Sequence, residues 1–194
     1  ELAKILTQQF PKHPFGWKVL GAVYQQTGRL GESLAAKQKS VGLSPQDAEA
    51  HNNLGNTLQG LGRSDEAEVS LRQAIALRPD YAEAHNNLGI TLQELGRLDE
   101  AEASFRQTIA LQPDYAAAHS NLGITLKELG RLEESISCFV RAISLEADFD
   151  NAYSNLGSAL KNASFSKADP SLYPILINLF NRGNFGLYNQ KNNT

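Results

Sequence analysis

Apolar positions recur along most of the chain at the spacing of amphipathic helices. Within residues 48–61 the apolar stripe has the spacing i, i+4, i+8 and i+11 and consists of Ala50, Leu54, Leu58 and Leu61. Gly62 follows, and Gly suits the left-handed residue that ends a helix. A second apolar stripe runs up to Pro79, which cannot continue a helix, and consists of Ala67, Leu71, Ala74, Ile75 and Leu77. The pattern therefore predicts two helices joined by a tight turn, and no segment has the alternation of a strand.

This two-helix unit repeats every 34 residues. Two successive blocks, 48–81 and 82–115, are identical at 27 positions. A Leu-Gly pair recurs at Leu20-Gly21, Leu54-Gly55, Leu88-Gly89, Leu122-Gly123 and Leu156-Gly157. A Gly-Arg pair and a Pro keep the same period, at Gly28, Gly62, Gly96 and Gly130 and at Pro11, Pro45, Pro79 and Pro113. Such a period is typical of an array of stacked helix pairs.

The register divides the chain into blocks. Residues 1–13 contain the second helix of a partial repeat, and the complete blocks are 14–47, 48–81, 82–115 and 116–149. Residues 150–162 are the first helix of a fifth repeat, and 163–194 are a loop, a short helix over 171–182 and a polar tail. We interpret 171–182 as a cap on the last apolar face, or else as a contact helix for a following domain or another copy. Because the chain starts with a half-repeat and without Met, we expect a truncated array.

Three local patterns predict details of each block. Gly55, Ala67 and Ala74 lack bulk where the two helices of a pair cross, which predicts close packing there. Asp80 and Glu83 have the spacing of a capping box for the next first helix. The Arg residues of the turns form a basic row, and we expect the nearby acidic residues Asp65, Asp99 and Glu133 to neutralise it.

Together these features resemble the tetratricopeptide repeat (TPR) family over about residues 1–162. Beside the period, Leu-Gly pair and Pro, the match includes a small residue early in the second helix (Ser33, Ala67, Ala101, Ser135) and a bulky apolar one four residues later (Leu71, Phe105, Phe139). The sequence departs from the family pattern at a few positions. Lys37 stands at the bulky apolar position, and Ala147 replaces the Pro. An aromatic residue expected early in the first helix is present as Trp17 and Tyr153 but is replaced by His51, His85 and His119. The resemblance implies an all-α, right-handed superhelical solenoid of antiparallel helix pairs.

The sixth position of each block reads Val19, Asn53, Asn87, Asn121 and Asn155. In this family the first helices line the concave side, so four Asn recur on one face. Successive repeats displace the position by roughly 10 Å, and an extended peptide advances about 3.3 Å per residue. One amide, which both donates and accepts, thus meets about every third peptide unit. The predicted peptide-binding residues are Asn52, Asn53, Asn56, Asn86, Asn87, Asn121 and Asn155. The alternative is that each Asn bonds to the neighbouring repeat and only braces the stack.

These observations predict a protein–protein interaction module that binds an extended peptide or a partner protein. The repeats look most similar to the arrays that precede the catalytic region of O-linked N-acetylglucosamine transferases and their bacterial relatives. The Asn ladders of the transferase arrays are thought to hold peptides. One alternative is therefore the substrate-recognition arm of a larger enzyme such as a glycosyltransferase, and another is self-association through the terminal helices. A clamp for a terminal carboxylate is disfavoured, because only two of its five positions match and Glu83 has the wrong sign.

Composition narrows the functions further. The 194 residues carry 18 Lys and Arg against 21 Asp and Glu, a net charge of -3, so neither a nucleic acid nor an anionic membrane is an expected partner. The lack of a long apolar run or signal peptide predicts a cytoplasmic protein. Cys138 is the single Cys, and His51, His85 and His119 lie a full repeat apart, too far to share a metal ion. We predict no catalytic residue, metal or cofactor, and hence no enzyme.

Overall fold

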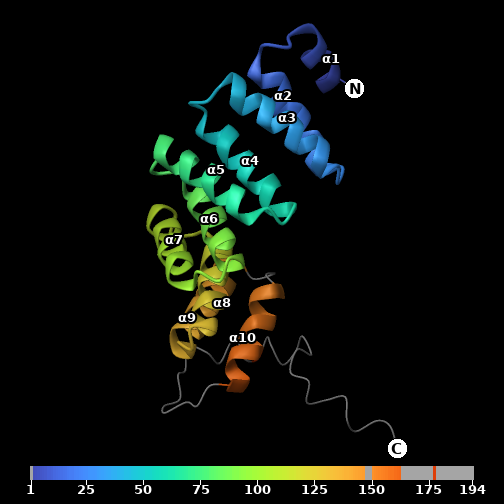
Figure 1. The fold of residues 1–194 in the computed structure, drawn as a ribbon. Coiled ribbons are helices and arrows are strands. Elements are labelled where there is room, and N and C mark those ends of the chain that lie inside the picture. Colours follow the sequence, from blue (N-terminus) through green and yellow to red (C-terminus); the bar gives the residue numbers. More distant parts are fainter. Residues whose placement is uncertain (1, 147–149, 163–176, 178–194) are drawn as a thin grey trace, which may run out of the picture. The chain divides into compact units, whose positions relative to one another are not determined.

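The computed structural model describes residues 2–146, 150–162 and 177, which form ten α-helices and no strand (Figure 1). The first helices of the repeats are α2 (Pro14–Gln26), α4 (Ala48–Gly60), α6 (Ala82–Glu94), α8 (Ala116–Glu128) and α10 (Asp150–Asn162). The second helices are α1 (Leu2–Gln9), α3 (Leu30–Leu43), α5 (Ser64–Leu77), α7 (Leu98–Leu111) and α9 (Leu132–Leu145). Apart from Ile177, the cap predicted over 171–182 lies outside the described residues.

Consecutive helices pack against one another within two compact units, residues 1–111 and 112–194. In the N-terminal unit α2 packs on α3, α4 on α5 and α6 on α7, and the second helices α1, α3 and α5 also contact the first helix that follows each of them. In the C-terminal unit α8 packs on α9, and α9 on α10. The prediction of an all-α solenoid of helix pairs is therefore confirmed. The helix pairs lie inside the predicted blocks, whose exact limits stay a prediction.

Each complete pair turns at a Gly with a left-handed backbone. Gly28, Gly62, Gly96 and Gly130 have φ between 70° and 78°, a region that other residues rarely adopt. After the turn, the backbone N–H of Arg63 donates to the carbonyl of Leu58 at 2.9 Å, which fixes where the second helix starts. The Gly of the turn thus performs the role that the sequence predicts.

A second Gly lets the two helices of a pair cross closely. A Cβ added to Gly55 would lie 2.6 Å from Cγ of Leu71, and one added to Gly89 would lie 2.6 Å from Cε1 of Phe105. Real Cβ atoms do not approach so closely, so a bulky side chain of the second helix occupies the space above each Gly. The predicted packing register is confirmed.

The predicted capping box is wrong. Helix α6 begins at Ala82 with Tyr81 as its N-cap residue and no side-chain cap, so Asp80 lies one residue too early. In the preceding repeat Asp47 occupies the position of Tyr81, and its carboxylate accepts from the backbone N–H of Ala50 at 3.1 Å. Glu83 instead bonds to a neighbouring repeat, as described below.

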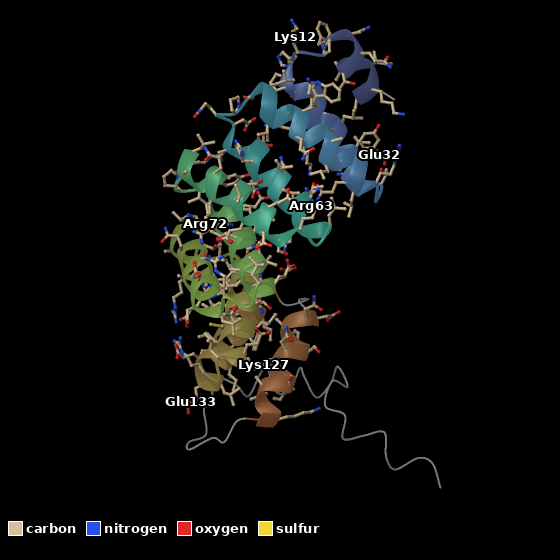
Figure 2. The ribbon with its side chains drawn as sticks, in the orientation of Figure 1. Lys12, Glu32, Arg63, Arg72, Lys127 and Glu133 are labelled. Atoms are coloured by element: carbon tan, nitrogen blue, oxygen red, sulfur yellow. The ribbon has the colours of Figure 1, made fainter. Side chains whose placement is uncertain are left out.

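The acidic partners of the turn arginines also differ from the prediction. Each Arg pairs with the Glu three residues later, as in Arg63–Glu66 (2.6 Å) and Arg131–Glu134 (2.7 Å). Asp65, Asp99 and Glu133 precede those partners by one residue and point elsewhere on the helix surface, because residues three apart lie on one face. Figure 2 shows the Arg63 and Arg72 side chains at the surface of the N-terminal unit, and Arg72 bridges Glu68 and Glu100 there.

Candidate functional site

The seven predicted Asn residues fall into two groups by exposure. Asn52, Asn86 and Asn87 are buried. Asn53, Asn56, Asn121 and Asn155 are half-buried. Since a ligand can reach only the second group without rearrangement, burial separates residues that the sequence pattern treats as equivalent.

The buried pair Asn52 and Asn87 braces two successive first helices. Nδ2 of Asn87 donates to Oδ1 of Asn52 at 3.0 Å. Nδ2 of Asn52 in turn donates to the hydroxyl of Tyr81 at 3.3 Å and to Oε1 of Glu83 at 3.1 Å. Both amides are thus used inside the stack, and burial raises the pKa of the Tyr81 phenol beside them.

Asn53 is repeat-equivalent to Asn87 but has a different environment. Its backbone carbonyl accepts from Lys37 and Thr57, whereas its half-buried side-chain amide has no hydrogen-bond partner among the described residues. One turn further along α4, Asn56 accepts at Oδ1 from Nε2 of Gln25 at 3.1 Å. Asn53, Asn56 and Gln25 therefore lie together where α2 meets α4, and we call this place the α2–α4 seam.

In the C-terminal unit, Asn121 lies on α8 and Asn155 on α10. Both are half-buried, and the backbone carbonyl of Asn121 accepts from Oγ1 of Thr125 at 3.0 Å. The same carbonyl bond recurs from Thr91 to Asn87 at 2.9 Å. The sixth position thus has the same helical setting in both units, although its side-chain contacts vary.

The acidic residues at the start of α4 form ion pairs with Lys18 of α2. Nζ of Lys18 lies 2.9 Å from Oδ2 of Asp47 and 2.9 Å from Oε2 of Glu49. Burial alone would lower the pKa of Lys18, but the two carboxylates outweigh it and raise that pKa. Lys18 and Glu83, two of the positions at which a carboxylate clamp would place its residues, thus take part in contacts between repeats.

Lys37 on α3 is a buried cation beside the α2–α4 seam. Its side chain is 4% exposed, and Nζ donates to the carbonyl of Asn53 at 3.0 Å, to Oγ1 of Thr57 at 2.7 Å and to Oε1 of Gln25. Burial lowers its pKa to about 8. The sequence offered a signal, since Lys37 stands where the repeat pattern has a bulky apolar residue, but not the position of its ammonium group.

The aromatic-type position ties each first helix to the turn before it. Nε1 of Trp17 donates to the carbonyl of Pro11 at 2.9 Å. Nε2 of each His at this position bonds in the same way to the Pro carbonyl six residues earlier, at 2.9–3.0 Å, in the pairs His51–Pro45, His85–Pro79 and His119–Pro113. These rings have a structural role, and the described residues contain no group of three or more His, Cys, Asp or Glu able to hold a metal ion.

Comparison with known proteins identifies the family. The tetratricopeptide repeat model matches residues 46–114 and 80–146, which together span more than half of the chain. The chain therefore belongs to the tetratricopeptide repeat family, whose repeats are in general non-catalytic scaffolds for protein–protein interaction. No curated protein sequence matches the chain. Within the described part, no helix has the length and apolar character needed to cross a membrane.

Solved structures share the fold. PilW, a type IV pilus biogenesis factor, is 24% identical with a TM-score of 0.78, over 94% of this chain and 84% of PilW. PilF of Pseudomonas aeruginosa is 21% identical with a TM-score of 0.74, over 88% and 76%. YrrB, described as a TPR protein with an unusual peptide-binding site, is 17% identical with a TM-score of 0.70, over 93% and 92%. At these identities the likeness concerns the fold.

Proposed function

We propose that the chain binds an extended peptide segment of a partner protein across the first helices of a unit, with half-buried Asn side chains as the contacts. The observation that carries the proposal is the Asn53 amide, which is half-buried and has no hydrogen-bond partner among the described residues. An amide at such a position offers both a donor and an acceptor to a peptide backbone. A peptide-binding site in the structurally similar protein YrrB supports this use of the fold.

The proposal divides the seven Asn residues by role. Asn53 and Asn56 are the proposed ligand contacts of the N-terminal unit, and Asn121 and Asn155 are those of the C-terminal unit, each unit being taken by itself. Asn52, Asn86 and Asn87 are buried, and the bonded pair Asn52 and Asn87 braces the stack and so holds the contact residues in place. The same division applies to a free-standing interaction module and to the substrate-recognition arm of a larger enzyme such as a glycosyltransferase.

A displayed library of random 12-residue peptides, selected on the full chain, supplies the probe for a test. The best synthetic peptide is labelled and titrated by fluorescence anisotropy. We expect Asn53→Ala to weaken binding about tenfold, which corresponds to roughly 1.4 kcal/mol. The matched control is Gln73→Ala, which removes an exposed amide from α5, a second helix. Equal affinity for the wild type and Asn53→Ala would reject Asn53 as a contact.

A second candidate is self-association through the N-terminal helices, which a specific surface favours. Leu2 and Ile5 of α1, Phe10 of the following turn and Phe15 of α2 are all exposed, and they make this end of the N-terminal unit apolar. Apolar patches of this kind often mark interaction sites. The proposed occupant is the same surface of a second copy. Light scattering over a range of concentrations tests it: Phe10→Ser with Phe15→Ser should turn a dimer into a monomer, and a wild type that stays monomeric rejects the candidate.

A further inference from the structure

Lys37 carries a buried positive charge without an acidic partner among the described residues. All three acceptors of its ammonium group, on Gln25, Asn53 and Thr57, are neutral. The side chain is almost completely buried. Buried charges are normally paired, and other cations nearby follow that rule, as Lys18 does with Asp47 and Glu49. The positive charge of Lys37 is thus uncompensated within its own surroundings.

The packing of α3 on α2 places the Lys37 ammonium at the α2–α4 seam. The aliphatic part of Lys37 lies above Gly21, where a Cβ would come within 2.7 Å of its Cγ. Leu71, Phe105 and Phe139 occupy the corresponding space above the later Gly residues, and they are apolar. The stem of Lys37 therefore fills the helix crossing, and its longer side chain carries the ammonium on to the α2–α4 seam.

The acidic residues around α4 do not cancel the charge at this seam. Asp47 and Glu49 lie at the start of α4 and share Lys18. Asn53 and Asn56 lie one to two turns further along the helix. A charge held behind a low-dielectric wall acts more strongly than one in water, so the half-buried amides of the seam lie in a positive field.

We propose that Lys37 selects a ligand with an acidic side chain at the α2–α4 seam. The inference rests on the proposed peptide-binding function and specifies the chemistry of its ligand. The free amide of Asn53 donates a hydrogen bond to the ligand carboxylate, and Lys37 supplies the charge from beneath without direct contact. Since Leu71 takes the place of Lys37 at the next crossing, the acidic residue also fixes the register of the ligand along the repeats.

The test compares peptides selected from the same random 12-residue library on the full wild-type chain and on Lys37→Leu. Leu is the residue that the next repeat has at this position, so the variant keeps the packing. The charge-matched control is Lys39→Leu, which changes an exposed lysine of the same helix. We expect Asp or Glu at one aligned peptide position for the wild type and for Lys39→Leu, and loss of this preference for Lys37→Leu.

A titration of the selected peptide completes the test. Replacing its acidic residue by the matching amide should weaken binding to the wild type about tenfold and leave binding to Lys37→Leu unchanged. Acidic enrichment that survives in Lys37→Leu, or peptides without an acidic preference, would overturn the inference. If no selected peptide is sensitive to Asn53→Ala, the peptide-binding function itself fails, which separates the two proposals.

Discussion

At the residue scale, equivalent side chains of successive repeats differ in their contacts. Asn53 and Asn87 have the same position in the 34-residue register. Asn87 is buried and donates to Asn52, whereas Asn53 has a half-buried amide without a partner among the described residues. The difference arises in the preceding repeat. The residue 35 positions before Asn87 is Asn52, which accepts its hydrogen bond, whereas the residue 35 positions before Asn53 is Lys18, which pairs with Asp47 and Glu49. A neighbouring repeat thus decides what an Asn does.

This difference predicts unequal stability effects. Asn87→Ala removes a donor from the buried Oδ1 of Asn52, and an unsatisfied buried polar atom costs about 1–3 kcal/mol. Asn53→Ala removes a half-buried amide without an internal partner, and should change the free energy of unfolding by less than about 0.5 kcal/mol. Urea unfolding followed by circular dichroism measures both. Equal losses for the two variants would contradict the division between bracing and contact residues.

At the element scale, each helix pair depends on a small residue in one helix facing a large one in the other. Sequence reasoning identified this pairing from Gly55, Ala67 and Ala74, because a Gly inside a helix costs roughly 1 kcal/mol and needs a steric reason. The structure confirms the reason at Gly55 and Gly89. The prediction of a capping box at the start of α6 is wrong, because the sequence does not show which residue is the N-cap and Asp80 lies one residue before it.

The crossing predicts a large effect at Gly89. Gly89→Leu forces a side chain into the space of the buried Phe105 ring, and overpacking of this kind costs about 1–3 kcal/mol. Gly42→Leu is the matched control, since Gly42 lies in α3 and a Cβ there meets nothing within 4 Å. The control should be neutral or slightly stabilising because Leu favours helix more than Gly does. Thermal melting that is unchanged in Gly89→Leu would show that the crossing tolerates bulk.

At the scale of the whole molecule, the pH dependence of unfolding should carry the signature of Lys37. Its pKa is about 8 in the folded chain, below the ordinary value of 10.5, because burial disfavours the charged form. Between these two values the unfolded chain binds more protons, so the free energy of unfolding rises with pH. The gain from this group between pH 7 and pH 10.5 is on the order of 1–3 kcal/mol.

The comparison with Lys37→Leu isolates that gain from the titration of other groups. The stability difference between the variant and the wild type should be largest near pH 7 and shrink as the pH approaches 10.5. Urea unfolding at a series of pH values measures it, with Lys39→Leu as the control for an exposed lysine. A difference that stays constant with pH would show that folding does not lower the pKa of Lys37.

The sequence by itself determined the fold class, the family and the register of the repeats. These follow from local and periodic features: amphipathic stripes, turn Gly residues and small residues at crossings that recur every 34 positions. Each of these features acts within one helix pair, so it can be recognised from the local sequence without knowledge of how the pairs stack. The sequence also singled out Lys37 as a departure from the apolar pattern.

Only the tertiary structure decided which members of a repeated position are available to a ligand. Whether Asn53 or Asn87 has a partner depends on side chains 34 or 35 positions away, such as Asn52 for Asn87. The same holds for Lys37, whose ammonium reaches Asn53 and Thr57 in the next repeat. Burial and hydrogen bonding between repeats are properties of the stack, and a periodic sequence does not distinguish a residue that braces it from one that faces outward.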